Sequence, residues 1–155
     1  FVIREKKKPR RIDKEKIQLY NIPTAFYENL KNGEDYITAT GEIITNENVT
    51  TANTPVRSYA FCSDTIYNEI LADSVREANL LYHETTYLRD LEDRAASRFH
   101  CTTDQAANIA LLANVKKMII GHFSSKYEKL DDFLSETKEV FTNTELAVEG
   151  VTFIV

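Results

Sequence analysis

The chain has few of the features that mark a secreted, membrane-bound or disulfide-stabilised protein. Its 155 residues include only two cysteines, Cys62 and Cys101, and these lack the paired spacing of a thiolate zinc motif. No apolar run approaches the roughly 20 residues that cross a bilayer, and no signal-peptide pattern opens the sequence. These absences argue against a disulfide framework and a cysteine-based metal site. They favour a soluble, cytoplasmic protein with reduced thiols.

Internal repeats and low-complexity tracts are also absent, and the length suits one domain with a substantial core. Neither end resembles a solvated tail, because residues 1–3 (FVI) and 151–155 (VTFIV) are largely apolar. We therefore expect the chain to be a piece of a longer protein.

The charge is unevenly distributed along the chain. A net charge of −5 argues against indiscriminate nucleic-acid binding. Residues 1–16, however, hold eight Lys or Arg against three acidic residues, a local charge of +5 that leaves −10 for the rest. This basic segment is either a solvated charge run or a local contact for phosphates.

The first part of the chain, residues 1–57, carries all three prolines and only short periodic runs. Its patterns predict a strand at 1–5, helices at 13–20 and 24–31, a small hairpin of 36–40 with 43–44, and a polar connector at 45–57. Asp13 is the expected N-cap of the first helix.

Residues 58–155 are more regular. Apolar runs and helical spacing predict strands at 58–62, 79–83 and 116–121, helices at 66–75, 102–113 and 127–141, and a closing strand or hairpin at 146–155. Strands that alternate with helices pair in parallel through right-handed crossovers, so the expected class is α/β.

Three of these strands end on side chains that bind metals or transfer protons: Asp64, His83-Glu84 and His122. In open α/β sheets the ligand crevice lies outside the carboxyl ends of the strands, which makes these ends the expected site. The Asp64 carboxylate can bridge two cations, or it can cap the helix expected near Ile66. His122 after Gly121 is either a zinc ligand or an ordinary core or loop histidine.

His100 directly precedes the helix predicted from Thr102, where free backbone N–H groups favour anions such as phosphate. From that position an imidazole can protonate a leaving alkoxide, and Glu84 can orient it. Ordinary surface-loop residues are the alternative for both.

Five motifs of the chain resemble, in order and spacing, the C-terminal part of ribonuclease Z, the tRNA 3′-processing endonucleases of the metallo-β-lactamase fold. They are residues 59–65 (YAFCSDT), 81–86 (LYHETT), 100–102 (HCT), 121–127 (GHFSSKY) and 141–144 (FTNT). Residues 1–57 resemble the family's preceding segment less closely, through 22–23 (IP) and 30–34 (LKNGE).

The resemblance implies the C-terminal half of a four-layer αββα sandwich. It implies that Asp64 bridges two zinc ions, that His122 binds one of them, and that Glu84 and His100 assist at the scissile phosphate. Thr85 replaces the family's usual Ala, and Cys101 replaces its usual Ser, which leaves the acid and the imidazole in place.

The family's principal zinc motif, His-x-His-x-Asp-His, does not occur in this chain, nor do its further histidine ligand and its proton-accepting aspartate. Asp64 and His122 alone cannot hold two zinc ions, because an open catalytic zinc needs three protein donors. We therefore expect half of a zinc-dependent endoribonuclease that removes the 3′ trailer from precursor tRNA. The intact enzyme is expected to be homodimeric, and this part alone inactive and weak in zinc binding.

Two other functions stay open from the sequence. One is a phosphodiesterase of the same fold that acts on another substrate. The other is a non-catalytic RNA-binding or assembly module that uses the basic segment 4–16.

Overall fold

The computed structural model describes residues 1–155, which separate into two compact units. Residues 1–5 and 57–155 form one, here called the sheet unit, and residues 6–56 form the other, here called the inserted unit. The strand predicted at 1–5 is present but belongs to the sheet unit, whereas the sequence grouped it with residues 6–57. None of the helices is both long and apolar enough to span a lipid bilayer.

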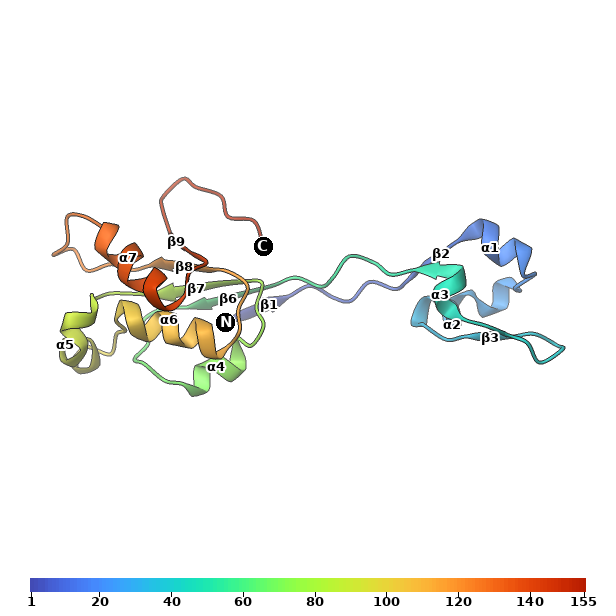
Figure 1. Ribbon diagram of the computed structural model, residues 1–155, viewed down its shortest axis with the longest axis horizontal. Helices are drawn as coiled ribbons and strands as arrows, with labels where there is room; N and C mark the ends of the chain where they lie inside the picture. The colour runs from blue at the N-terminus through green and yellow to red at the C-terminus, as the bar shows by residue number, and fades with distance from the viewer. The chain divides into compact units, whose positions relative to one another are not determined.

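The sheet unit is built on one five-stranded sheet (Figure 1). Its order is β1 (Val2–Arg4), β6 (Ser58–Cys62), β7 (Leu80–Glu84), β8 (Met118–Gly121) and β9 (Thr144–Leu146). The strands from β6 to β9 pair in parallel, as the alternating pattern predicts, and β1 lies antiparallel at the edge. The register pairs Cys62 with His83 and Glu84 with Gly121, so the carboxyl ends of three strands lie beside one another.

Helices cover one face of this sheet. They are α4 (Ile70–Ser74), α6 (Thr103–Leu112) and α7 (Asp131–Val140). A further helix, α5 (Glu92–Ser97), follows the 3-10 turn η2 (Arg89–Leu91). Leu81 and Ile120 of the sheet are buried in one cluster with Ile109 of α6 and Phe133 of α7. The predicted capping box of Thr102 and Gln105 is present at the start of α6.

The opposite face of the sheet carries aromatic side chains, because successive residues of a strand point to opposite faces. The Phe61 ring stacks on Phe1 at a centroid distance of 5.2 Å and on Tyr82 at 4.6 Å. Phe1 is 71% exposed. One helical layer on one sheet is what half of the expected sandwich contains.

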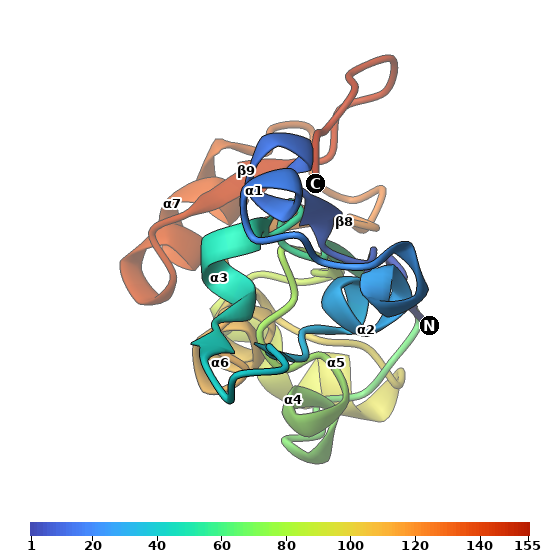
Figure 2. The same ribbon diagram turned by 90° about the vertical axis from the view of Figure 1, so that its right-hand side faces the viewer.

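The inserted unit has its own small core. Figure 2 draws this part of the chain in blue to turquoise. Its elements are β2 (Arg11–Ile12), α1 (Lys14–Leu19), the 3-10 turn η1 (Thr24–Phe26), α2 (Tyr27–Asn32), β3 (Tyr36–Ile37), β4 (Ile43–Ile44), α3 (Asn46–Val49) and β5 (Thr50–Thr51). Ile17, Leu30 and Val49 are buried together in its centre. Asp13 caps α1 as predicted by accepting hydrogen bonds from the backbone N–H groups of residues 15 and 16, and the predicted hairpin is β3 with β4.

The prediction of a polar connector at 45–57 was wrong. This stretch contains α3 and β5, and β5 pairs with β2. Asn46 is buried because its side-chain amide donates to the backbone oxygens of Leu30 and Glu34, at 2.7 and 3.0 Å. A polar residue that satisfies buried carbonyl groups therefore occupies a core position that hydrophobic periodicity cannot reveal.

Three predicted boundaries in the sheet unit were also wrong. The helix expected at 66–75 is only α4, and the one expected at 127–141 starts at Asp131. The closing strand expected at 146–155 ends at Leu146, which lies opposite Ile120 of β8.

Candidate metal site at the strand ends

Asp64, His100 and His122 converge beside the carboxyl ends of β6, β7 and β8. Their ligand atoms all lie within 4.8 Å of one another. Asp64 Oδ1 is 3.1 Å from His122 Nε2, and the rings of His100 and His122 have centroids 5.2 Å apart. These residues are 22 to 58 positions apart in the sequence, so the parallel register of the sheet brings them together.

The backbone is strained at two of these residues. Asp64 has φ 49° and His122 has φ 62°, both in the left-handed region. A non-glycine residue there costs about 1–2 kcal/mol, and such strain gathers at functional sites. The alternative that Asp64 caps a helix is wrong, because α4 begins only at Ile70.

Glu84 is the buried acid behind the cluster, with a side chain that is 0% exposed. Its Oε1 accepts hydrogen bonds from His100 Nδ1 at 2.9 Å and from the Thr65 backbone N–H at 3.0 Å. Its Oε2 accepts from the Thr86 hydroxyl at 2.6 Å and from the Thr86 backbone N–H at 3.2 Å. Burying an ionised carboxylate is costly unless it is hydrogen-bonded, and four donors meet that need.

His100 is oriented by this acid. Because a carboxylate only accepts, the Nδ1–H of His100 donates to Glu84 and leaves Nε2 as the other nitrogen of the ring. Tyr87 packs edge-on against the imidazole at a centroid distance of 6.3 Å. The expected contact between Glu84 and His100 is therefore present in the structure.

Sequence reasoning assigned no role in this network to the hydroxyl of Thr86 or the thiol of Cys101. The Thr86 hydroxyl lies 2.9 Å from His122 Nδ1 as well as beside Glu84. The Cys101 thiol donates to the Thr65 carbonyl oxygen at 3.0 Å, and burial raises the pKa of this thiol to about 12. Thr86 stands in a motif two residues after the acid, which is the one local signal that pointed to it.

His83 lies outside the cluster although it precedes Glu84. Its side chain is buried, and its Nδ1 is 2.7 Å from the Glu84 carbonyl oxygen. Burial lowers the pKa of His83, so the neutral form is favoured. Gly121, which precedes His122, lies against Tyr82, since a Cβ atom at Gly121 would lie 2.5 Å from the Tyr82 hydroxyl.

The donor set of Asp64, His100 and His122 suits zinc. One carboxylate oxygen and two imidazole nitrogens are zinc-type ligands. If His100 serves proton transfer, Asp64 and His122 remain as zinc ligands, which is fewer than the three protein ligands of an open zinc site. A pair of zinc ions needs more donors than this cluster supplies.

Among known proteins, the chain is similar in sequence to ribonuclease Z from several bacteria. No family model matches it. It is 39% identical over 151 residues to ribonuclease Z from Bacteroides thetaiotaomicron, which is 97% of this chain and 48% of that protein. It is 40% identical to ribonuclease Z from Bacteroides fragilis, over 97% of this chain and 50% of that protein. The chain thus spans about half the length of the curated relatives it matches, and the expected resemblance to ribonuclease Z is confirmed.

The fold has a solved counterpart in the metallo-β-lactamase fold protein YhfI from Bacillus subtilis. The TM-score is 0.57 at 21% identity, and the match covers 66% of this chain and 44% of that protein. This likeness confirms the expected α/β fold of the metallo-β-lactamase type.

Proposed function

We propose that this chain is about half of a zinc-dependent endoribonuclease that removes the 3′ trailer from precursor tRNA. The observation that carries the proposal is the cluster of Asp64, His100 and His122 beside the buried Glu84. It occurs in a chain about 40% identical to ribonuclease Z along nearly its whole length. The free thiols Cys62 and Cys101 accord with a reducing, cytoplasmic location.

In this proposal Asp64 and His122 would be the zinc ligands that this chain contributes to the complete protein. The remaining ligands come from the half that this chain does not span. Zinc, when bound, supplies the Lewis acidity that activates water and offsets negative charge on the phosphate.

His100 is the proposed proton donor to the leaving group. Hydrolysis breaks the bond between the phosphorus and the 3′ oxygen of the tRNA, and that oxygen needs a proton to leave as a hydroxyl. Glu84 holds Nδ1 of the His100 ring, so Nε2 is the nitrogen available for the transfer. His100 is partly exposed, which gives a substrate access to it.

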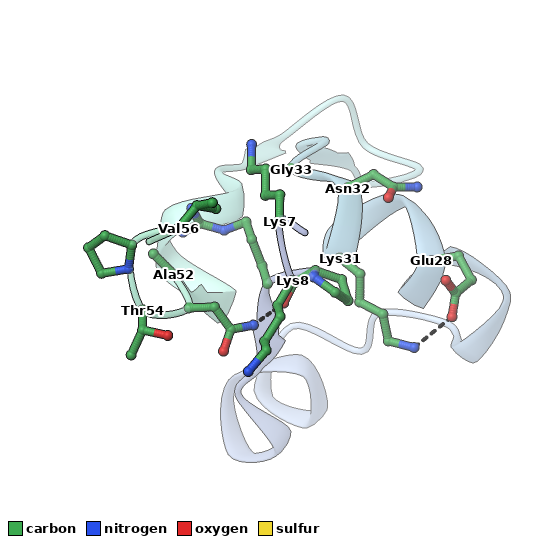
Figure 3. A pocket seen from close by; sticks show the side chains of 13 residues that line it. Lys7, Lys8, Glu28, Lys31, Asn32, Gly33, Ala52, Thr54 and Val56 are labelled. Atoms are coloured by element: carbon green, nitrogen blue, oxygen red, sulfur yellow. Dashed lines mark hydrogen bonds and ion pairs between the residues drawn. The ribbon is translucent and has the colours of Figure 1, made fainter. Parts of the chain in front are cut away.

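The inserted unit supplies a basic hollow of about 690 Å³. Lys7, Lys8, Arg10 and Lys31 line it (Figure 3). Its single acid, Glu28, is paired with Lys31 at 2.6 Å, so the hollow keeps an excess of positive charge. We infer that it contacts the phosphate backbone of the RNA, in a manner that weakens as salt rises. The same hollow is the observation that favours the second candidate, a non-catalytic RNA-binding module.

The test is cleavage of precursor tRNA by the complete protein of which this chain is a part. We expect His100→Ala to lower the rate by about 10²–10⁴-fold, the usual contribution of a general acid. Replacing Lys7 and Lys8 by Ala should weaken RNA binding and flatten its salt dependence without abolishing hydrolysis of a small phosphodiester.

Three results would contradict the proposal in different ways. Hydrolysis of a model diester without cleavage of precursor tRNA would indicate a phosphodiesterase with another substrate. RNA binding without any hydrolysis would indicate the RNA-binding module. Robust tRNA cleavage by the 155-residue chain alone would refute its assignment as an incomplete part of the enzyme.

We also propose that the intact enzyme is a homodimer. This part of the proposal rests on the resemblance to ribonuclease Z, which implies a homodimer. Light scattering after size-exclusion chromatography of the complete protein measures the mass, and a monomer at micromolar concentration would argue against it.

A further inference from the structure

Phe99 is an exposed aromatic residue at a position where the backbone disfavours it. Its φ of 62° lies in the left-handed region, and the residue is 70% exposed. Bulky residues rarely adopt this conformation, because the Cβ atom comes too close to the following carbonyl oxygen. The Phe99 ring packs against no other ring or cation of the chain, so nothing within the chain offsets this strain.

The end of helix α5 imposes the conformation. The Phe99 backbone N–H donates to the Ala96 carbonyl oxygen at 3.2 Å, and the His100 backbone N–H donates to the Ala95 carbonyl oxygen at 2.9 Å. These two hydrogen bonds define the Schellman motif, in which the residue after the C-cap is left-handed. Glycine is the usual residue at that position and asparagine the next, since both tolerate a positive φ.

Other helices of the chain end on the residues that this motif favours. Asn21 follows α1 and Asn114 follows α6, both with φ 50° and the same pair of hydrogen bonds. Gly33 ends α2 with φ 99°. Among these four helix ends, only that of α5 carries a large apolar residue. The cap itself does not need a phenylalanine, so the ring has its use in a contact outside this chain.

The end of α5 next to Phe99 is basic, although acidic residues outnumber basic ones in the sheet unit. Arg94 and Arg98 are exposed and form no ion pair with a carboxylate. The acidic residues of this helix, Glu92 and Asp93, lie in its first turn, at the other end. A polyanion approaching Phe99 therefore meets two unpaired guanidinium groups.

Arg94 also connects this surface to the candidate proton donor. Its Cζ lies 5.8 Å from the centroid of the Tyr87 ring, and that ring packs edge-on against His100. Phe99 directly precedes His100 in the chain. An exposed aromatic ring beside unpaired cations is the combination with which proteins hold single-stranded nucleic acid, because bases stack on the ring and phosphates contact the cations.

We propose that Phe99 stacks on a nucleobase beside the scissile phosphate and that Arg94 and Arg98 contact the neighbouring phosphates. Consecutive Cα atoms are about 3.8 Å apart, so a phosphate held at His100 brings its flanking nucleotides within reach of Phe99. Every base has a π face, so the contact tolerates different sequences at the cleavage site. This inference rests on the proposed function, which supplies RNA as the ligand.

Thermal unfolding of the complete protein tests whether Phe99 has a structural role instead. Phe99→Asn should raise the unfolding midpoint by about 2–4 °C, because asparagine relieves the strain at this cap. Asn114→Phe is the matched control at the end of α6 and should lower the midpoint by a similar amount. A lower midpoint in Phe99→Asn would show that the rest of the protein packs on the ring, and would overturn the proposal.

RNA binding to the complete protein tests the contact with a base. Fluorescence anisotropy compares intact precursor tRNA with two RNAs that lack the base on the 5′ or the 3′ side of the cleavage site. Phe99→Ala should weaken binding of the intact RNA by about 5–150-fold, the usual contribution of one stacked base. It should have little further effect on the RNA that lacks the contacted base, since both changes remove the same interaction. Phe99→Tyr keeps a ring and should bind like the wild type.

Equal losses for Phe99→Ala on the intact RNA and on both abasic RNAs would overturn the proposal. Cleavage of the same RNAs separates this inference from the proposed function. Base-dependent coupling in a protein that cleaves none of them would refute the proposed function and leave the stacking role standing. Cleavage of precursor tRNA without such coupling would refute the stacking role alone, and a protein that binds no RNA would refute both.

Discussion

Replacing Glu84 by Gln tests how much the buried carboxylate contributes to the sheet unit. The substitution keeps the shape but replaces one acceptor oxygen by an NH₂ group. If the amide oxygen takes the place of Oε1, it still accepts from His100 and Thr65, but the NH₂ group faces the Thr86 backbone N–H. If it takes the place of Oε2, the NH₂ group faces the Thr65 backbone N–H instead. In either orientation a buried donor loses its acceptor, and every remaining bond loses its charge assistance.

The expected loss of stability follows from the hydrogen bonds that the substitution breaks or weakens. A buried donor left without an acceptor costs about 1–3 kcal/mol, and a hydrogen bond to a charged group contributes about 1 kcal/mol more than a neutral one. Burying the neutral amide is less costly than burying the charge, which returns part of this loss. We therefore expect Glu84→Gln to lower the free energy of unfolding by about 2–4 kcal/mol, a large share of the 5–15 kcal/mol typical of a domain.

Urea unfolding followed by far-UV circular dichroism measures this difference, with hydrogen exchange of β7 and β8 to confine it to the sheet unit. The exposed Glu128 provides the control, and Glu128→Gln should change stability by no more than about 0.5 kcal/mol. A loss below about 1 kcal/mol for Glu84→Gln would show that the four hydrogen bonds do not organise this part of the fold.

Three further predictions concern His83, Cys101 and Gly121. Burial holds the pKa of His83 below its ordinary value of 6.5, so the unfolded chain binds the proton first as pH falls. Stability should therefore drop by up to about 1.4 kcal/mol per unit below pH 6.5, and His83→Gln should remove this part of the slope in urea titrations at several pH values. An identical slope in the variant would contradict it. With its pKa raised to about 12, Cys101 should resist iodoacetamide near neutral pH until urea unfolds the chain, and mass spectrometry showing rapid labelling of the folded chain would refute this. Gly121→Ala should cost about 1–3 kcal/mol of overpacking against Tyr82, read from thermal melts, and Tyr82→Leu in the same chain should recover part of it; no change in melting temperature would show that the ring moves freely.

The central strands could be predicted from the sequence because they are short apolar runs bounded by polar residues. Leu80–Glu84 and Met118–Gly121 are almost wholly buried, and nothing local competes with extended backbone there. The helix at 66–75 could not be placed correctly by periodicity. The Asn68 side chain accepts from the Ile70 backbone N–H and so favours a start at Ile70.

The site also contains residues that the sequence predicts and contacts that it does not. Asp64, His100 and His122 could be predicted as site residues because each follows a predicted strand or precedes a predicted helix. The hydrogen bond of Thr86 to His122 and that of Cys101 to Thr65 each join residues 36 positions apart. Such contacts depend on the register of neighbouring strands and on loop paths, and no local pattern encodes them.

The burial of these residues shows which side of the site this chain completes. Glu84 is 0% exposed and fully hydrogen-bonded, while Asp64 is 71% exposed despite its strained backbone. Strain of this kind persists only where the surroundings or a ligand offset it. The sheet shows the same asymmetry, since its helix-covered face is sealed and its aromatic face is open. The missing ligands and the missing cover are both accounted for if the other half of the relatives' length packs on the open face and brings donors to Asp64 and His122.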